Sequence, residues 1–215
     1  MTRHSDTLRE LEANVLVAIL RGPSPELALR AARAIHAGGI RLIEVTMTVP
    51  NALGVLEEIG KVLGDDVTLG AGTVLDAETA RTCVGAGARF IVSPNFDPAT
   101  VEMARSLGAV SIPGALTPTE IVTAARAGAD CVKVFPCSAV GGPDYLKALR
   151  GPLPDIKLVA TGGVHLENVV DYLAAGATAV GLGAGLIDWG RLEREGDQSV
   201  VGQTRRFVAA IANGR

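Results

Sequence analysis

Aromatic residues are scarce in this chain of 215 residues, at 3% of the composition. Ala, Val, Leu and Gly fill the interior instead, and such small side chains suit closely packed layers of helices and strands. The three cysteines, Cys83, Cys131 and Cys137, are odd in number and form no C-x-x-C pair. We therefore expect reduced thiols that serve as packing residues in a cytoplasmic protein.

Strong charge of either sign and long apolar runs are also missing. The formal net charge is −3, so the chain lacks the excess of positive charge that is typical of proteins that bind nucleic acid. The longest apolar runs last about six to eight residues, far short of the roughly 20 that span a membrane. The first residues, "MTRHSDTLRELEAN", lack the apolar core of a signal peptide. His4, His36 and His165 are scattered without ligand spacing, so we expect no metal site.

The chain has instead a unit that recurs along its whole length. Segments such as "AIHAGGIRLIEVTM" and "YLAAGATAVGLG" run from an alanine-rich helix end through glycine into an apolar strand. Glycine suits the position after a helix because it adopts a positive φ angle at little cost. The apolar periodicity predicts eight strands. They lie near residues 15–20, 40–46, 67–72, 88–93, 109–113, 129–135, 156–161 and 177–182.

Apolar strands that alternate with helices predict an α/β fold with a parallel sheet covered by helices. Eight such units, with no residues left over for another domain, predict closure into a (β/α)₈ TIM barrel that spans residues 1–215 as a single domain. A short N-terminal helix near residues 6–13 and a closing helix near 198–213 complete the fold. An open doubly wound sheet is the alternative.

A barrel of this kind carries its chemistry at the carboxyl ends of its strands, where Lys133 stands in the apolar "CVKVFP". The stem of this lysine could pack along apolar neighbours while its amine reaches solvent. Alternatively, burial lowers the pKa of Lys133, and the neutral amine attacks a ketone to form a Schiff base. The resulting iminium stabilises a carbanion on the adjacent carbon, which is what a class I aldolase requires.

Glu44 is a second charge inside an apolar strand, in "LIEVT". It could form a structural ion pair with Lys133 or Arg21. It could instead be the proton shuttle that carbinolamine formation and dehydration both need. Apolar surroundings raise the pKa of a carboxyl group and a nearby cation lowers it, so both outcomes stay open.

Two glycine-rich segments, "TGGV" at 161–164 and "GLGAG" at 181–185, follow the last two predicted strands. In many barrels these loops bind phosphate through backbone N–H groups, and the helix after the last strand would add its positive end. Simple turn formation is the alternative. We expect His165 in the first turn of a helix, without a role.

As an ordered set, these motifs resemble the bacterial 2-keto-3-deoxy-6-phosphogluconate (KDPG) and 4-hydroxy-2-oxoglutarate aldolases over nearly the whole chain. The motifs are "VAILRG", "IEVTMTVPNAL", "GAGTVL", "FIVSPN", "IPGALTPTE", "VKVFP", "TGGV" and "GLG". The resemblance implies a class I pyruvate aldolase, an aldehyde-lyase of the Entner–Doudoroff pathway. It also implies a cytoplasmic homotrimer that needs no metal or organic cofactor.

The resemblance assigns roles to residues of this chain. Lys133 forms the Schiff base, Glu44 is the acid and base, and Thr73 holds the carboxylate of the keto acid. We expect Arg21 to help orient that carboxylate. The remaining substrate-binding residues are expected to be Pro94 and Phe135, which form an apolar wall, Thr161, and the phosphate-binding Gly162, Gly163, Gly183 and Ala184.

The chain departs from the family pattern in two places. Phosphogluconate-type members have a carboxylate-binding arginine where this chain has Thr48, and Arg21 could replace that cation, as the arginine of "AILRG" does in phosphogalactonate aldolases. Thr161, by contrast, resembles the phosphogluconate type, and its hydroxyl could favour one C4 epimer. Ala184 replaces a serine whose hydroxyl contacts phosphate in many relatives, so phosphate could be less important here.

The expected reaction is reversible cleavage of 2-keto-3-deoxy-6-phosphogluconate to pyruvate and glyceraldehyde 3-phosphate. The same chemistry could act on the phosphogalactonate epimer or on 4-hydroxy-2-oxoglutarate. A phosphate-binding barrel isomerase or synthase would share the glycines without needing Lys133. A sugar-phosphate sensor would not need the pair of Lys133 and Glu44.

Overall fold

The computed structural model describes residues 3–214 and contains one parallel sheet, in the order β5-β4-β3-β2-β1-β9-β8-β7-β6. Its strands are β1 (Leu16–Leu20), β2 (Leu42–Thr46), β3 (Thr68–Gly72), β4 (Phe90–Val92), β5 (Val110–Ile112), β6 (Gly114–Ala115), β7 (Val132–Val134), β8 (Leu158–Thr161) and β9 (Ala179–Leu182). Each predicted strand contains an observed one. All of the pairings are parallel, as predicted.

The sheet closes through β5 and β6, which are one barrel strand interrupted at Pro113. β5 pairs with β4, and β6 pairs with β7. The carbonyl of Pro113 still accepts from the amide of Lys133 at 2.8 Å, so the ladder continues across the interruption. Because β5 and β6 count as one, the nine assigned strands make eight barrel strands. The (β/α)₈ barrel is confirmed, and the open doubly wound sheet was wrong.

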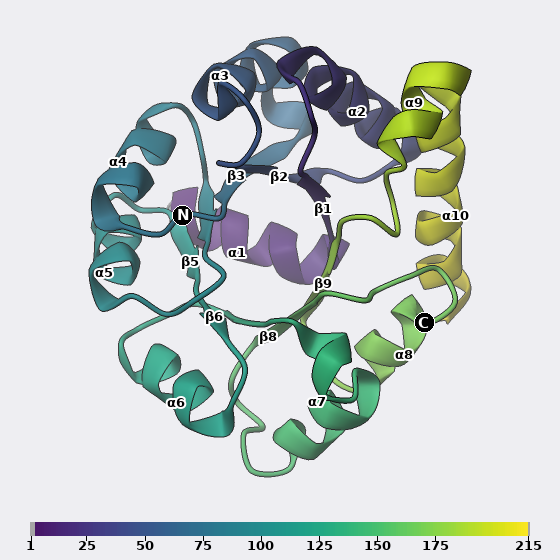
Figure 1. Ribbon diagram of the computed structural model, residues 1–215. Coiled ribbons are helices and arrows are strands. Elements are labelled where there is room, and N and C mark those ends of the chain that lie inside the picture. The colour runs from purple at the N-terminus through teal and green to yellow at the C-terminus, as the bar shows by residue number, and fades with distance from the viewer. Residues whose placement is uncertain (1–2, 215) are drawn as a thin grey trace.

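Helices surround the strands on the outside (Figure 1). The outer helices are α2 (Pro25–Gly38), α3 (Ala52–Leu63), α4 (Ala77–Gly85), α5 (Pro98–Ser106), α6 (Pro118–Arg126), α7 (Pro143–Arg150), α8 (Val169–Ala174), α9 (Trp189–Glu195) and α10 (Gln198–Gly214). The remaining helices are α1 (Arg3–Asn14) and the short 3₁₀ helices η1 (Gly64–Asp66) and η2 (Cys137–Val140). Several begin at a residue that caps the free N–H groups. The hydroxyl of Thr117 accepts from the amide of Glu120, whose carboxylate accepts from the amide of Thr117 in return. In the described chain, no helix is long and apolar enough to cross a membrane.

The N-terminal helix α1 crosses the end of the barrel at which the strands begin (Figure 1). Its Leu11 enters the barrel and packs with Val17 and Leu42 in the interior cluster. Its polar side chains bind residues at the starts of strands. Nε2 of His4 contacts Asp130 at 2.9 Å, and Nζ of Lys157 contacts Glu12 at 2.7 Å. Because α1 covers this end, the opposite end is left for a site.

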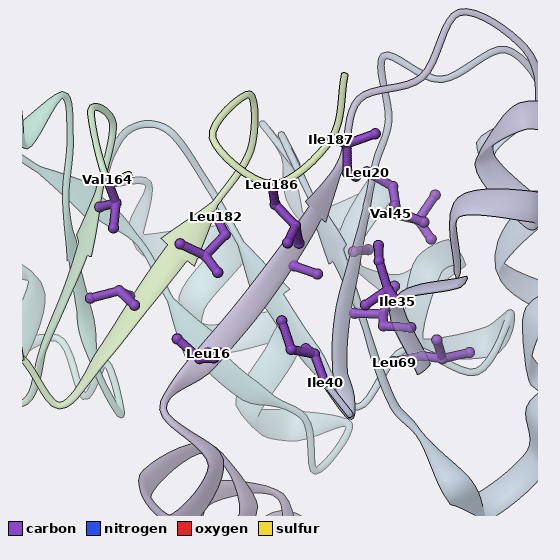
Figure 2. Close-up of a cluster of buried hydrophobic side chains, with 14 of the residues drawn as sticks. Leu16, Leu20, Ile35, Ile40, Val45, Leu69, Val164, Leu182, Leu186 and Ile187 are labelled. Atoms are coloured by element: carbon purple, nitrogen blue, oxygen red, sulfur yellow. The ribbon is translucent and has the colours of Figure 1, made fainter. Parts of the chain in front are cut away.

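The main core lies between the barrel and its helices. Leu16 and Leu20 of β1 point outward and pack with Ile35 of α2, as part of the cluster in Figure 2. Val17 lies between them in sequence and faces the interior instead. This alternation along β1 places every second side chain inside the barrel, and the same parity carries the functional side chains.

Candidate active site

A cavity of about 460 Å³ opens at the carboxyl ends of the strands. Every residue that the sequence predicted for the site lines it, except Glu44. The lining residues are Ile19, Arg21, Thr73, Pro94, Lys133, Phe135, Thr161, Gly162, Gly163, Val164, His165, Gly181, Gly183, Ala184 and Gly185. The strands thus bring together residues from opposite ends of the sequence, from Ile19 to Gly185. This size suits a small ligand such as a sugar acid.

Lys133 is the middle residue of β7, and only 5% of its surface is exposed. Its Nζ lies 4.7 Å from the ring centroid of Phe135. Burial is the main cause that lowers the pKa of Lys133, and the charge of Arg21 acts in the same direction. The charge of Glu44 opposes both, but the pKa stays below its ordinary value. A larger neutral fraction makes this amine a better nucleophile than an exposed lysine.

Glu44 is the middle residue of β2 and is 2% exposed. Burial raises the pKa of its carboxyl group, and the charges of Lys133 and Arg21 only partly offset this effect. Gly72, on the adjacent strand β3, is in contact with this carboxyl group, which fills the space where a side chain would stand. A carboxyl group with a raised pKa can both donate and accept a proton near neutral pH.

Lys133 and Glu44 affect each other's pKa without forming an ion pair. The ion pairs within residues 3–214 involve other side chains. The sequence left open a structural ion pair between Glu44 and either Lys133 or Arg21, and the structure does not form one. A pair of groups that interact across a gap leaves room for a substrate atom or a water molecule between them.

Arg21 follows β1, and its guanidinium group bridges two loops. One terminal nitrogen donates to the hydroxyl of Thr48, and the other donates to that of Thr73, both at 3.2 Å. Thr73 has a φ angle of +58°, which is unusual for a β-branched residue and costs conformational energy. The strained turn after β3 places the Thr73 side chain against Arg21 at the cavity.

The glycines after β8 form the opposite side of the cavity. Gly162 and Gly163 have φ angles of +90° and +76°, which L side chains rarely adopt. The carbonyl of Gly162 accepts from the amide of Ser138 at 3.2 Å, and a side chain at 163 would overlap that of Ser138. The loop after Lys133 therefore rests on this turn, and both positions require glycine.

Thr161 is the last residue of β8 and is 6% exposed. A Cβ atom at Gly181, on the adjacent strand, would lie 2.6 Å from its hydroxyl oxygen. Gly181 thus makes room for Thr161 at the cavity wall. Gly114 makes room for Pro94 in a similar way, because a Cβ atom at Gly114 would overlap the Pro94 carbonyl group.

The expectation for the end of the chain's last strand needs a correction. Residues after Gly183 form a turn, in which the Gly183 carbonyl accepts from the amides of Leu186 and Ile187. The following helix α9 starts only at Trp189, and the carboxylate of Asp188 caps it. The positive helix end expected beside the glycines is therefore displaced and already occupied by an acidic side chain.

Two lining residues, Ile19 and His165, were not expected at the site. Three others lie in the glycine-rich segments that the sequence pointed to, but were not assigned to substrate binding individually: Val164, Gly181 and Gly185. Ile19 lies two residues before Arg21, so strand alternation could have identified it. His165 was expected in the first turn of a helix without a role, but α8 begins at Val169, and His165 lies in the preceding turn, at the cavity. The periodicity of a short helix does not define where its first turn begins.

Metal-binding geometry is absent from residues 3–214, where no group of three or more His, Cys, Asp and Glu side chains could hold an ion. The cysteines Cys83, Cys131 and Cys137 are free and buried. Burial raises the pKa of Cys83 and Cys137 to about 11 and that of Cys131 to about 12. These thiols are protonated packing groups, as predicted.

Comparison with known proteins gives consistent matches. A family model described as KDPG and KHG aldolase matches residues 7–203. The 2-dehydro-3-deoxy-6-phosphogalactonate aldolase of Escherichia coli (strain K12) is 38% identical over 186 residues, which cover 86% of this chain and 90% of that protein. The 2-dehydro-3-deoxy-phosphogluconate aldolase of Treponema pallidum (strain Nichols) is 42% identical over 149 residues, or 69% and 70% of the two chains.

A solved structure is also similar. KDPG aldolase from Legionella pneumophila, with pyruvate captured at low pH as a covalent carbinolamine intermediate, superposes with a TM-score of 0.85. The two sequences are 28% identical, and the match covers 93% of this chain and 96% of the other. The similarity therefore extends over the barrel and its cavity.

Proposed function

Because this chain belongs to the KDPG and KHG aldolase family, we propose that it cleaves 2-keto-3-deoxy-6-phosphogluconate through a Schiff base on Lys133. One observation carries the proposal. A buried amine with a lowered pKa lines the cavity, beside a buried carboxyl group with a raised pKa. Opposite shifts of this kind in neighbouring groups are typical of acid–base sites.

Schiff-base formation comes first. The neutral Nζ of Lys133 attacks the C2 carbonyl carbon. Glu44 supplies a proton to the oxygen and takes one from the nitrogen that attack leaves positively charged, which gives a neutral carbinolamine and a reprotonated Glu44. Glu44 then protonates the departing hydroxyl group, and water leaves with formation of the iminium. The apolar wall of Phe135 and Pro94 keeps the amine uncharged before attack. Thr73 and Arg21 orient the substrate carboxylate.

Cleavage follows from the iminium, which withdraws the electron pair of the C3–C4 bond. Glu44, through a water molecule, removes the proton of the C4 hydroxyl group, and glyceraldehyde 3-phosphate leaves. The enamine that remains is protonated at C3 and hydrolysed to pyruvate, which restores Lys133. The iminium itself provides the electron withdrawal, and we propose that the enzyme uses no metal ion or organic cofactor.

The glycine turn and Ala184 are proposed to bind the phosphate of the substrate. Gly162, Gly163 and Gly183 line this side of the cavity, and their backbone N–H groups would donate to the anion. Removing the phosphate should lower kcat/KM by more than about tenfold, or about 1.4 kcal/mol. A smaller change would mean that phosphate is not a main determinant of binding.

The phosphogalactonate epimer and 4-hydroxy-2-oxoglutarate are the alternative substrates, because all three form the same iminium. Arg21 and its contact with Thr48 favour the phosphogalactonate epimer as substrate. Thr161 favours the phosphogluconate epimer. Measured side by side, kcat/KM values for the three compounds decide between them.

The decisive experiment is trapping with pyruvate and borohydride, followed by peptide mass mapping. The wild-type protein should gain one pyruvate-derived adduct on Lys133. Lys133→Met should gain none, whereas Lys147→Met, at an exposed position of α7, should gain it as the wild type does. An unmodified wild-type protein, or an adduct on another lysine, would show that the mechanism is wrong.

We further propose that the enzyme is a cytoplasmic homotrimer. The family resemblance supports both parts of this proposal. The free, buried thiols support the cytoplasmic location. Sedimentation equilibrium at micromolar concentration should give three times the mass of the chain. A monomer mass under the conditions of the assay would contradict it.

A further inference from the structure

We propose that Thr48 and Thr46 position the guanidinium group of Arg21 through a hydrogen-bond chain that runs in one direction only. The hydroxyl of Thr46 donates to the carbonyl of Leu20 at 2.9 Å. The hydroxyl oxygens of Thr46 and Thr48 lie 2.8 Å apart, and Arg21 donates to Thr48 at 3.2 Å. This inference rests on the proposed function, in which Arg21 orients the substrate carboxylate.

The direction of the chain follows from donor counting. A carbonyl oxygen can only accept, so the single hydroxyl proton of Thr46 is used on Leu20. The short bond between the two threonines must then be donated by Thr48, which uses the only proton of that hydroxyl. The oxygen of Thr48 consequently presents lone pairs, and Arg21 donates into one of them.

Thr73, the other partner of Arg21, differs from Thr48 in how its hydroxyl proton is used. Its hydroxyl accepts from Arg21, and no acceptor for its own proton is found within residues 3–214. Thr73 can therefore donate to an anion in the cavity, whereas Thr48 cannot. The structure assigns Thr73 to substrate binding and Thr48 to positioning, although both contact the same guanidinium group.

The hydrogen-bond chain is anchored in the protein interior. Thr46 is fully buried at the end of β2, and Leu20, at the end of the adjacent strand β1, is also fully buried. Thr48 and Arg21 are exposed. A long side chain at the surface loses substantial rotamer entropy when it is held in one place. The hydroxyl groups of Thr48 and Thr73 accept from the guanidinium group and hold it in place before the substrate binds. Less rotamer entropy of Arg21 is then lost on binding.

The guanidinium group keeps N–H groups for the substrate. Arginine offers more donors than the two bonds to Thr48 and Thr73 use. Thr48, where the family resemblance implies an arginine, thus holds the guanidinium group of Arg21 at the cavity. Loss of the Thr48 hydroxyl should therefore weaken binding of the keto acid and leave bond cleavage largely unaffected.

The test compares Thr48→Val, Thr48→Ser and Thr82→Val, whose hydroxyl bonds only within the exposed surface of α4. Thr48→Val should raise KM about tenfold, the effect of one lost hydrogen bond to a charged group, with kcat changed less than about twofold. Thr48→Ser should restore KM to within about twofold. Thr82→Val should match the wild type.

A double-mutant cycle with Arg21→Met separates positioning from a general structural effect. In the Arg21→Met background, Thr48→Val should add nothing to KM, because the group it positions is absent. Thr46→Val should also raise KM, and the double variant with Thr48→Val should be no worse than Thr48→Val alone. Equal effects of Thr48→Val in both backgrounds, or no effect in either, would overturn the proposal.

Borohydride trapping distinguishes this inference from the proposed function. With pyruvate, Thr48→Val should need a higher ketone concentration for half-maximal trapping. With acetone, which has no carboxylate, it should trap as the wild type does. A wild-type protein that traps neither ketone contradicts the Schiff-base mechanism, whereas normal trapping with no effect of Thr48→Val contradicts only the positioning role.

Discussion

The carboxyl group of Glu44 occupies the space beside β3 that a side chain at residue 72 would need. A Cβ atom on Gly72 would overlap the Oε1 and Cδ atoms of Glu44. The φ angle of Gly72 is not in the left-handed region, so alanine would meet no backbone strain there. The requirement for glycine is thus set by the proposed acid–base group alone.

Gly72→Ala should therefore impair catalysis more than folding. Displacing Glu44 by about 1 Å is enough to lower kcat by about 100-fold. The matched control is Gly202→Ala in α10, where a Cβ atom meets open space. It should leave kcat unchanged and stabilise the helix by about 0.5–1 kcal/mol, measured by urea unfolding. An unchanged kcat in Gly72→Ala would show that the location of Glu44 is not critical.

The charges around Lys133 predict two pH shifts of opposite sign. The carboxylate of Glu44 raises the pKa of Lys133, so Glu44→Gln should lower that pKa further. Arg21 lowers the pKa of Lys133, so Arg21→Met should raise it. Because only the neutral amine reacts, trapping should increase as the pH rises through this pKa, at a pH below the value of about 10.4 for a free lysine.

The measurement is the pH midpoint of acetone trapping by borohydride, which avoids any contribution of the carboxylate contact. Relative to the wild type, the midpoint should move to lower pH in Glu44→Gln and to higher pH in Arg21→Met. Thr82→Val serves as the control with an unchanged midpoint. Shifts in the same direction for both variants would contradict the electrostatic account.

The sequence could predict the barrel because each strand carried a short apolar run after a helix and a glycine. The same regularity made Lys133 and Glu44 conspicuous, since a charge inside an apolar strand needs a reason. The cavity collected the expected residues because parallel strands end at one side of a barrel. The local sequence pattern was sufficient to predict the structure wherever the same unit of helix, glycine and strand recurs.

The remaining features depend on distances between strands. The relation between Glu44 and Gly72 is a contact across two strands, and nothing in "GAGT" identifies the atom that requires glycine. The donor–acceptor direction of the hydrogen bonds that lead from Arg21 to Leu20 depends on which oxygens lie within hydrogen-bond distance. The displaced start of α9 reflects an intervening turn and the cap at Asp188, which the glycine pattern did not reveal.

Thr161 should control which C4 epimer is preferred. Its hydroxyl lies at the cavity wall, where it could bond the C4 oxygen of one epimer and leave the other unmatched. Thr161→Val keeps the shape and removes the hydroxyl group. The ratio of kcat/KM values for the gluconate and galactonate substrates should fall by about tenfold, since one such bond contributes one to a few kcal/mol. An unchanged ratio would exclude this hydroxyl as the epimer determinant.

Ala184→Ser should strengthen binding of the phosphorylated substrate. Ala184 is exposed to the cavity between Gly183 and Gly185, so a hydroxyl group fits there without displacing a neighbour. A new bond from a neutral donor to a phosphate dianion should lower KM for 2-keto-3-deoxy-6-phosphogluconate about tenfold. KM for 4-hydroxy-2-oxoglutarate should not change, because that substrate has no phosphate. Ala209→Ser, at an exposed position of α10, should change neither value. If Ala184→Ser lowered KM for both substrates equally, the glycine turn would not be the phosphate site.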